Sequence, residues 1–354
     1  MYDYLIIGQG LAGTWLSHFL LQKNKTVLVI DDAHPLAASR VSSGLMNPIT
    51  GRKLVKSWKA EMLFPFARNH YRELEELLQA RFCYDRTMVW LLSNVKELNT
   101  FWAKSGEVGY EKYFKNIQNK AFHPAFKNEV GFGEITGAMF VNTVHLIDSY
   151  RQYVQKNGWF IEAKLDYKDL VVNEKSVTWR GVEAGKVIFC EGHQSRFNPY
   201  FNWLPFVPAK GEFLIIEALN LDLEKREQII KNKITLVPLS KDRYWVGSTY
   251  EWKELNETPT SKAQQELVIQ LEKTLKIPYK ILSHQAGIRP SAKDRRPFLG
   301  LHPQYSNVGI FNGLGTKGVS LSPYFAHHFA AYLEGEEALQ KEVDIERYSK
   351  FCKE

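Results

Sequence analysis

Two stretches near the amino terminus decide the fold: Tyr4-Leu-Ile-Ile-Gly8-Gln-Gly10-Leu-Ala-Gly13 and Val27-Leu-Val-Ile-Asp31. The first is an apolar strand that breaks into Gly-x-Gly-x-x-Gly, and the second is an apolar strand that ends in an acid. A helix from Thr14 to about Lys23 is expected between them. In such a unit Gly8 allows a tight turn, Gly10 lets a pyrophosphate approach, and Gly13 lets helix and strand pack closely. The alternative is an ordinary βαβ unit with a glycine-rich turn.

The ends of this unit predict which parts of a dinucleotide it would bind. Leu11 and Ala12 lie at the helix N-terminus, where backbone N–H groups face phosphates. Asp31 would accept hydrogen bonds from a ribose diol and repel a 2′-phosphate, which favours FAD or NAD over NADP. Asp32 would take this role if the register were shifted by one residue, and is otherwise a solvated turn residue.

The composition is that of a soluble globular protein large enough for two domains. The chain has 354 residues, of which 44% are hydrophobic and 24% charged. No apolar run approaches the ~18 residues that span a bilayer, and no cationic segment precedes the first strand. The cysteines (Cys83, Cys190, Cys352) and the histidines show no metal-binding spacing. We therefore expect a cytoplasmic, reduced protein with no membrane contact and no metal.

The net charge of +7 permits an acidic partner. Basic residues cluster at Arg52, Lys53, Lys56 and Lys59, and again at 293–296. A solvated surface is the default interpretation of such clusters, and RNA or another anionic substrate is the alternative.

The chain alternates strand and helix patterns without an internal repeat. Helices are expected at 61–80, 144–156, 261–275 and 320–333. Short strands are expected at 160–163, 169–172, 176–179 and 186–190, and strands of one antiparallel sheet at 214–217, 233–237 and 244–247. Residues 89–137 are aromatic-rich and are expected to form strands and loops of a separate lobe. A strand at 308–311 leads into a glycine loop at 312–318.

Several motifs, in this order, resemble the D-amino-acid oxidase family of FAD-dependent oxidoreductases. Besides the N-terminal fingerprint they are Ser42-Ser43-Gly44-Leu45-Met46, Val187-Ile-Phe-Cys-Glu-Gly192, Thr235-Leu-Val-Pro238…Trp245-Val-Gly247-Ser-Thr249, Gly287-Ile-Arg289-Pro290…Asp294…Pro297-Phe-Leu-Gly300 and Asn312-Gly-Leu-Gly315-Thr-Lys-Gly318. The 287–300 stretch is similar to glycine oxidase. The 313–318 loop is similar to the FAD domain of the enzyme that demodifies carboxymethylaminomethyl-uridine in tRNA.

The resemblance implies an α/β fold with a discontinuous, Rossmann-like FAD-binding domain. This domain would comprise residues 1–58, 138–205 and 284–354. Residues 59–137 and 206–283 would form an antiparallel-sheet substrate domain, α+β in character. Relatives attach flavin covalently through a histidine in the 37–46 loop or a cysteine within 286–320, and this sequence has neither. FAD is therefore expected to be bound non-covalently.

The resemblance also implies which residues contact the cofactor. They are Gly8, Gly10, Leu11, Ala12, Gly13, Asp31, Asp32, Ser39, Arg40, Ser43, Gly44, Leu45, Met46, Val171, Glu191, Gly192, Arg289, Gly313, Gly315, Thr316, Lys317, Gly318 and Val319.

Arg289 and Lys317 are the predicted catalytic residues. The place of Arg289 corresponds to the family's substrate arginine, whose planar fork pairs with a carboxylate in bidentate fashion; the alternative is a structural arginine between the lobes. Thr316 and Thr235 stand where glycine oxidase has a second arginine and a tyrosine, which puts glycine itself in doubt as substrate. Lys317 could substitute for that arginine, or point to solvent. An aromatic wall could come from Tyr244, Tyr250 and Trp252, which sheet packing explains equally well.

The function implied is oxidation of the C–N bond of a small amino acid or N-substituted glycine. Hydride would pass to flavin N5 and the imine would hydrolyse. Two alternatives stay open: demodification of a glycine-like tRNA wobble uridine, and a non-catalytic flavin-binding protein. The sequence leaves the electron acceptor and the oligomeric state undetermined.

Overall fold

A parallel sheet forms the centre of the nucleotide-binding domain. The computed structural model describes residues 1–127 and 130–352. Strands run parallel in the order β19 (Val308–Asn312), β12 (Val182–Phe189), β1 (Tyr2–Ile7), β2 (Val27–Asp31) and β9 (Phe160–Glu162). Antiparallel partners extend it: β18 (Phe298–Leu301) pairs with β19, and β11 (Val177–Trp179) joins β10 (Leu170–Val172) to β12. The predicted Rossmann-like α/β fold is confirmed.

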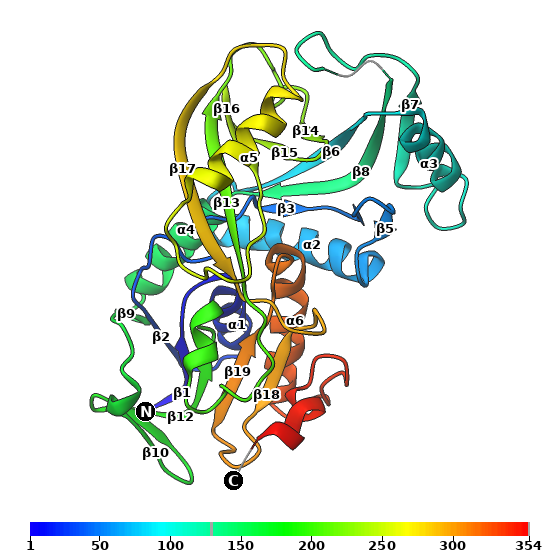
Figure 1. Cartoon of the computed structure of the whole chain (residues 1–354). Helices are drawn as coiled ribbons and strands as arrows, with labels where there is room; N and C mark the ends of the chain where they lie inside the picture. Colours follow the sequence, from blue (N-terminus) through cyan, green and yellow to red (C-terminus); the bar gives the residue numbers. More distant parts are fainter. Residues whose placement is uncertain (128–129, 353–354) are drawn as a thin grey trace.

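Four helices pack together on one face of this sheet. They are α1 (Leu11–Gln22), α2 (Ala60–Leu78), α4 (Thr143–Lys156) and α6 (Gly318–Leu333). Trp15, Tyr71 and Phe325 are fully buried in their shared core, which also includes Val29 of the sheet. The short helical turns η1 (Tyr167–Asp169), η2 (Gly192–Phe197) and η3 (Ile345–Phe351) complete this half of the molecule, which is the lower half in Figure 1.

A second, mostly antiparallel sheet makes up the other half, above it in Figure 1. The strands follow the order β17 (Lys280–Arg289), β13 (Ala209–Glu217), β16 (Arg243–Gly247), β15 (Thr235–Ser240), β14 (Gln228–Lys231), β6 (Cys83–Leu92), β8 (Gly131–Val141) and β3 (Leu45–Met46). The β14–β6 pair is parallel, and β7 (Phe114–Gln118) pairs with β8. Helix α3 (Val95–Ser105) packs beside β7, and β4 (Ile49–Thr50) pairs with β5 (Val55–Lys56).

The two faces of this sheet have different partners, because successive side chains of a strand point to opposite faces. Leu214, Leu236 and Val246 pack under α5 (Ser261–Glu272). Their neighbours Phe213 and Trp245 belong to a separate core on the opposite face. That opposite face turns toward the nucleotide-binding domain.

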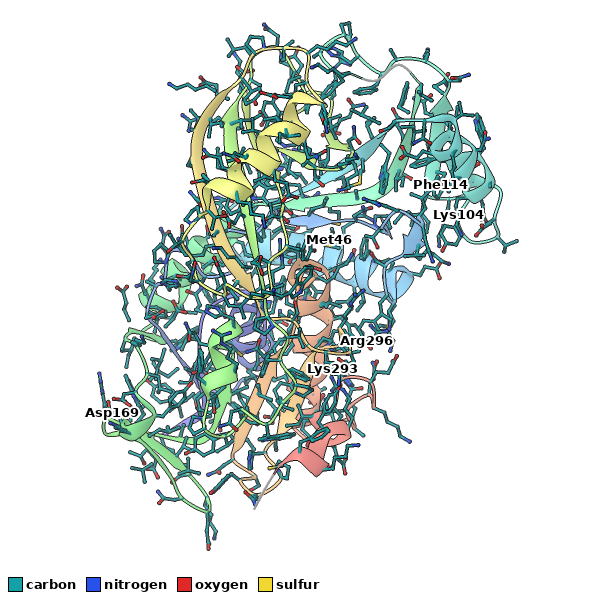
Figure 2. The ribbon with its side chains drawn as sticks, in the orientation of Figure 1. Met46, Lys104, Phe114, Asp169, Lys293 and Arg296 are labelled. Carbon is teal, nitrogen blue, oxygen red and sulfur yellow. The ribbon has the colours of Figure 1, made fainter. Side chains whose placement is uncertain are left out.

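The division of the chain into domains stays a proposal, and the packing of four elements, α2, β3, β8 and β17, differs from it. Helix α2 was expected in the substrate domain but packs on α6. Strand β3, residues 284–289 of β17 and residues 138–141 of β8 were expected in the FAD-binding domain but belong to the second sheet. Met46 of β3 accordingly lies at the junction of the two halves in Figure 2. Dividing the chain by the sheet to which each strand belongs thus gives different domain boundaries from dividing it by sequence motifs.

The strands expected within 89–137 are the end of β6, β7 and most of β8, with loops between them, whereas helix α3 was not expected. The four helices expected at 61–80, 144–156, 261–275 and 320–333 all form, within a few residues of those bounds. Among the described residues, no helix combines the length and apolarity needed to cross a bilayer.

Candidate active site

A cavity of about 840 Å³ lies between the two sheets. Its volume falls in the upper part of the range of roughly 300–1,000 Å³ typical of ligand sites. One end is formed by the β1–α1 turn and the end of β2, and the other by the inner face of the second sheet. A long ligand can therefore contact both domains at once.

The fingerprint glycines have the close contacts that the sequence predicts. A Cβ on Gly8 would lie 2.6 Å from the Cys190 carbonyl oxygen, and Gly8 has φ +97°. A Cβ on Gly13 would lie 1.8 Å from the Gly8 carbonyl oxygen. The turn and the helix therefore sit against the strands with no room for side chains.

Two helix N-termini open into the cavity. Gly10 precedes α1 and Lys317 precedes α6, and neither position has a side chain that caps the helix. Leu11 and Ala12 of the first helix line the cavity, as do Gly318 and Val319 of the second. Such N-termini offer N–H groups and a positive dipole end to anions. One end fits a pyrophosphate and the other fits the electron-rich edge of a flavin.

Asp31 is fixed at the nucleotide end by three donors. The Gln9 N–H donates to Oδ2 (2.6 Å), the Ala33 N–H donates to Oδ1 (2.9 Å), and the Arg151 guanidinium also reaches Oδ1. Arg151 comes from α4 and donates to the Gln9 side chain as well (2.6 Å). Asp31 thus keeps a defined orientation beside the space expected for a ribose.

Glu191 is a buried acid near the same end. Tyr167 Oη and Asn198 Nδ2 donate to its carboxylate at 2.7 and 2.8 Å. Burial raises the pKa of Glu191 to about 7, and these hydrogen bonds act in the opposite direction. Glu191 and Gly192 both line the cavity, as the sequence predicts.

Most of the predicted cofactor residues line this one cavity. They are Gly8, Gly10, Leu11, Ala12, Asp31, Asp32, Ser39, Arg40, Ser43, Gly44, Leu45, Glu191, Gly192, Arg289, Gly315, Thr316, Lys317, Gly318 and Val319.

Four predicted residues lie outside the cavity lining. Gly13 packs against the Gly8 carbonyl, and Gly313 packs against Phe298. Met46 is buried in the helical core. Val171 is 54% exposed on β10, which reaches β1 only through β11 and β12. Its predicted contact with the cofactor is therefore not supported, and Leu165 lines the cavity instead.

Arg289 is held against the inner face of the second sheet. Its Nη2 donates to Ser248 Oγ (2.6 Å), and its Nη1 donates to the Lys210 carbonyl oxygen (3.2 Å). The Tyr250 ring lies 4.2 Å from the guanidinium carbon. A Cβ on Gly211 would lie 2.0 Å from Nη2. Nη1 and Nη2 also donate to the Thr249 carbonyl oxygen, at the longer distances of 3.4 and 3.3 Å. The guanidinium is thus packed between a ring and a bare backbone, and both of its Nη atoms have protein acceptors.

Two lysines bring further positive charge to the cavity lining. Lys317 Nζ donates to Ser57 Oγ (2.9 Å), and Lys231 Nζ donates to Thr235 Oγ1 (2.9 Å). Burial lowers the pKa of each ammonium to about 8. Lys317 therefore points into the protein and not to solvent.

Sequence reasoning missed Lys231, Gly211 and Arg151. The signal for Lys231 is the alternation on β14, where Ile230 faces α5 while Ile229 and Lys231 face the cavity side. A strand was expected only from residue 233.

The three aromatic residues predicted to form a wall of the site lie in different places. Tyr250 lines the cavity. Tyr244 is buried under α5 on the opposite face of the sheet. Trp252 stacks on Tyr250 at 5.8 Å, is 59% exposed, and lies outside the lining.

The basic cluster after the flavin loop does not face the cavity. Lys56 pairs with Glu61 and Lys59 pairs with Glu342, and neither these lysines nor Arg52 and Lys53 line the cavity. The hypothesis that this cluster extends the site is not supported. In the second cluster, Arg296 stacks over Trp58 at 4.1 Å, and both Arg296 and Lys293 lie on the flank of the nucleotide-binding domain in Figure 2.

The chain belongs to the FAD-dependent oxidoreductase family that includes the D-amino-acid oxidases, because it matches that family over residues 3–332. It is therefore a flavoprotein enzyme. FAD fits the observed cradle: the β1–α1 turn and Asp31 would hold the nucleotide half, and the α6 N-terminus would face the flavin.

Similar proteins include glycine oxidases. The chain is 22% identical to glycine oxidase of Bacillus subtilis (strain 168) over 361 aligned positions, covering 91% of this chain and 90% of that protein. It is 26% identical to glycine oxidase of Pseudomonas aeruginosa, over 46% of this chain and only 45% of that protein.

Solved structures share the whole fold. Iminodiacetate oxidase from Chelativorans sp. BNC1 superposes with a TM-score of 0.79 and 20% identity, covering 98% of both chains. Glycine oxidase from Geobacillus kaustophilus superposes with a TM-score of 0.78 and 18% identity, covering 98% of this chain and 97% of the other.

Proposed function

We propose that this enzyme oxidises the C–N bond of a small amino acid or an N-substituted glycine. The observation that carries the proposal is Arg289, whose guanidinium is oriented by Ser248, Lys210 and Tyr250 at the end of the cavity opposite Asp31. The similarity of the chain to glycine oxidases, and its structural likeness to an iminodiacetate oxidase, support the same class of substrate.

The residues of the chain would position the substrate and stabilise charge. Arg289 would bind the α-carboxylate in exchange for its longer hydrogen bonds of 3.3 and 3.4 Å to the Thr249 carbonyl oxygen, which fixes the Cα–H bond in one direction. Bound FAD supplies the two-electron acceptor. Loss of hydride from Cα leaves an imine, and water converts this imine to an amine and a carbonyl acid.

Lys317 would act at the flavin edge. Lys317 is the residue before α6, and the N-terminus of this helix has no side-chain cap. A positive charge and a helix dipole at one place favour the negative charge that develops there on reduction. The negative charge of the reduced flavin would therefore be stabilised by the ammonium and the helix N-terminus, which are in position before the substrate binds.

Anaerobic mixing tests the proposal. N-methylglycine and other N-substituted glycines should bleach the oxidised flavin band, whereas a ligand that is not a substrate would only perturb it. Arg289→Lys should raise KM for a carboxylate substrate by at least about tenfold while FAD content is unchanged. A broad amine panel that leaves the band oxidised would refute the proposal.

A further inference from the structure

Four cationic side chains line the substrate half of the cavity: Arg289, Lys317, Lys231 and the exposed Lys233. In the described part of the chain, the hydrogen-bond partners of Arg289, Lys317 and Lys231 are hydroxyl and carbonyl oxygens, and none of these three forms an ion pair with a carboxylate. The acids that line the cavity are Asp31, Asp32, Glu191 and Glu257. Asp31 pairs with Arg151, Glu257 pairs with His34, and Glu191 accepts hydrogen bonds from Tyr167 and Asn198. Arg289, Lys317 and Lys231 are each half-buried, and cations withdrawn from water without acidic partners are costly, so they favour an anionic ligand.

Lys231 has unused hydrogen-bonding capacity. An ammonium has three N–H donors, and Thr235 Oγ1 accepts one of them. Lys231 ends β14 on the same face of the sheet as Trp245 and Phe213, whose rings stack at 5.3 Å. Its ammonium therefore stands beside an apolar wall, with donors free for a ligand.

The position of Lys231 relative to Arg289 follows from the strand register. Thr235, the partner of Lys231, lies opposite Gly247 on β16. The residue after Gly247 is Ser248, whose Oγ accepts from Arg289. Lys231 and Arg289 stand on β14 and β17, four positions apart in the sheet, but their side chains converge: Lys231 Nζ reaches Thr235 on β15, and the guanidinium lies over Gly211 on β13, two strands from β15. Neighbouring strands lie about 4.8 Å apart, and Gly211 is two residues along β13 from the row that joins Thr235, Gly247 and Phe213, so the two charged groups are separated by on the order of 10 Å. Two carboxylates of one small molecule can span such a distance.

We propose that the substrate carries a second carboxylate, which binds Lys231 while the α-carboxylate binds Arg289. The substrate class is then a dicarboxylic amino acid or an N-carboxyalkyl glycine. A carboxylate suits the site better than a phosphate, because one ammonium matches a single negative charge. This inference rests on the proposed function, since it assumes that Arg289 binds the first carboxylate.

Binding of unreactive analogues to the FAD-loaded enzyme tests the proposal. Thiodiacetate has two carboxylates and (methylthio)acetate has one, and sulfur replaces the oxidisable amine in both. Thiodiacetate should bind at least about tenfold more tightly, as measured by perturbation of the flavin spectrum and by calorimetry. Equal dissociation constants in the wild-type enzyme would overturn the proposal without any variant.

Substitutions then locate the second carboxylate. Lys231→Met should bring the two dissociation constants to within about threefold by weakening thiodiacetate alone, and Lys231→Arg should keep most of the preference. Lys241→Met is the matched control, because Lys241 is exposed in the β15–β16 turn and lies outside the cavity lining. A preference that survives in Lys231→Met, with FAD content and melting temperature unchanged, would overturn the assignment. If Lys231→Met fails to fold, Lys231→Gln is judged by the same criterion.

The two proposals fail in distinguishable ways. If N-methylglycine bleaches the flavin and the diacid shows no preference, only the second-carboxylate proposal is refuted. If no amine bleaches the flavin, the proposed function is refuted, and the analogue dissociation constants still decide whether Lys231 binds a carboxylate.

Discussion

Replacing Gly211 by alanine should displace the guanidinium of Arg289 and weaken its binding of a carboxylate. The substitution leaves the charge of Arg289 and the residues around the FAD unchanged. The added Cβ would lie 2.0 Å from Nη2, 2.3 Å from Cζ and 2.5 Å from Nη1. Non-bonded heavy atoms prefer separations of about 3.5–4.0 Å. The guanidinium therefore has to move by more than about 1 Å, and it loses its position opposite Ser248 Oγ and the Tyr250 ring.

The magnitude follows from the interaction that is lost. A bidentate, charge-assisted pair with a carboxylate contributes on the order of 2–4 kcal/mol. At 1.4 kcal/mol per factor of ten, this predicts dissociation constants raised by about 30- to 1,000-fold. A displacement of about 1 Å also costs on the order of 100-fold in rate where reacting atoms must be aligned.

The assay compares carboxylate binding and anaerobic flavin reduction in wild type, Gly211→Ala and Gly106→Ala. Gly106 ends α3, has negative φ, and would bring a Cβ no closer than 3.8 Å to the Ala103 carbonyl oxygen. It controls for a generic glycine-to-alanine change. Melting temperature and FAD content should be close to wild type in both variants.

A double-mutant cycle decides whether Gly211 acts through Arg289. Once Arg289→Met has removed the guanidinium, adding Gly211→Ala should weaken carboxylate binding no further, so the two effects are not additive. Additive losses, or normal carboxylate affinity in a folded Gly211→Ala protein, would refute the reasoning.

Three further predictions follow from the site. Acid precipitation should release all the FAD from the yellow protein, because the 37–46 and 286–320 segments lack the histidine and cysteine that anchor flavin in relatives; flavin that stays in the pellet contradicts this. Lys317→Met should lower the flavin midpoint potential, because only the protonated ammonium stabilises the reduced cofactor. The difference in potential from wild type should therefore shrink as pH rises through about 8. A difference that stays constant up to pH 10 argues against stabilisation of the reduced flavin by Lys317. KM for a small amino acid should change by only a few fold between low and physiological salt, whereas a tRNA substrate would lose about 1,000-fold or more in affinity through counterion release.

The sequence predicts those parts of the site whose geometry is local. Gly8, Gly10 and Gly13 act within one turn and one helix, so their spacing alone specifies the cradle, and a cavity that they help to form is observed. Arg289 could be identified because it lies in a recognisable motif. Motifs of this kind can be interpreted without knowing how strands that are distant in the sequence pair.

The parts that could not be predicted depend on long-range register. Lys231 becomes a cavity residue only because β14 pairs with β15 and, in parallel, with β6. Gly211 matters only because β13 pairs with β17, which brings it under the guanidinium of Arg289. The packing of helix α2 on α6 was not predicted either, because an apolar helix face in a sequence does not identify the element that will cover it.

The strand order of the first sheet has a consequence for how the protein is made. Strand β1 leaves the ribosome early, yet its neighbour β12 and the next strand β19 come from residues 182–189 and 308–312. At roughly 5–20 residues per second, about 15–60 s separate synthesis of the fingerprint from synthesis of the last parallel strand. Until then Leu5, Ile7 and Ile30, which are buried in the finished protein, have no complete sheet around them. We therefore expect the incomplete chain to be prone to aggregation, and truncation before α6 should yield insoluble protein and not an isolated nucleotide-binding domain.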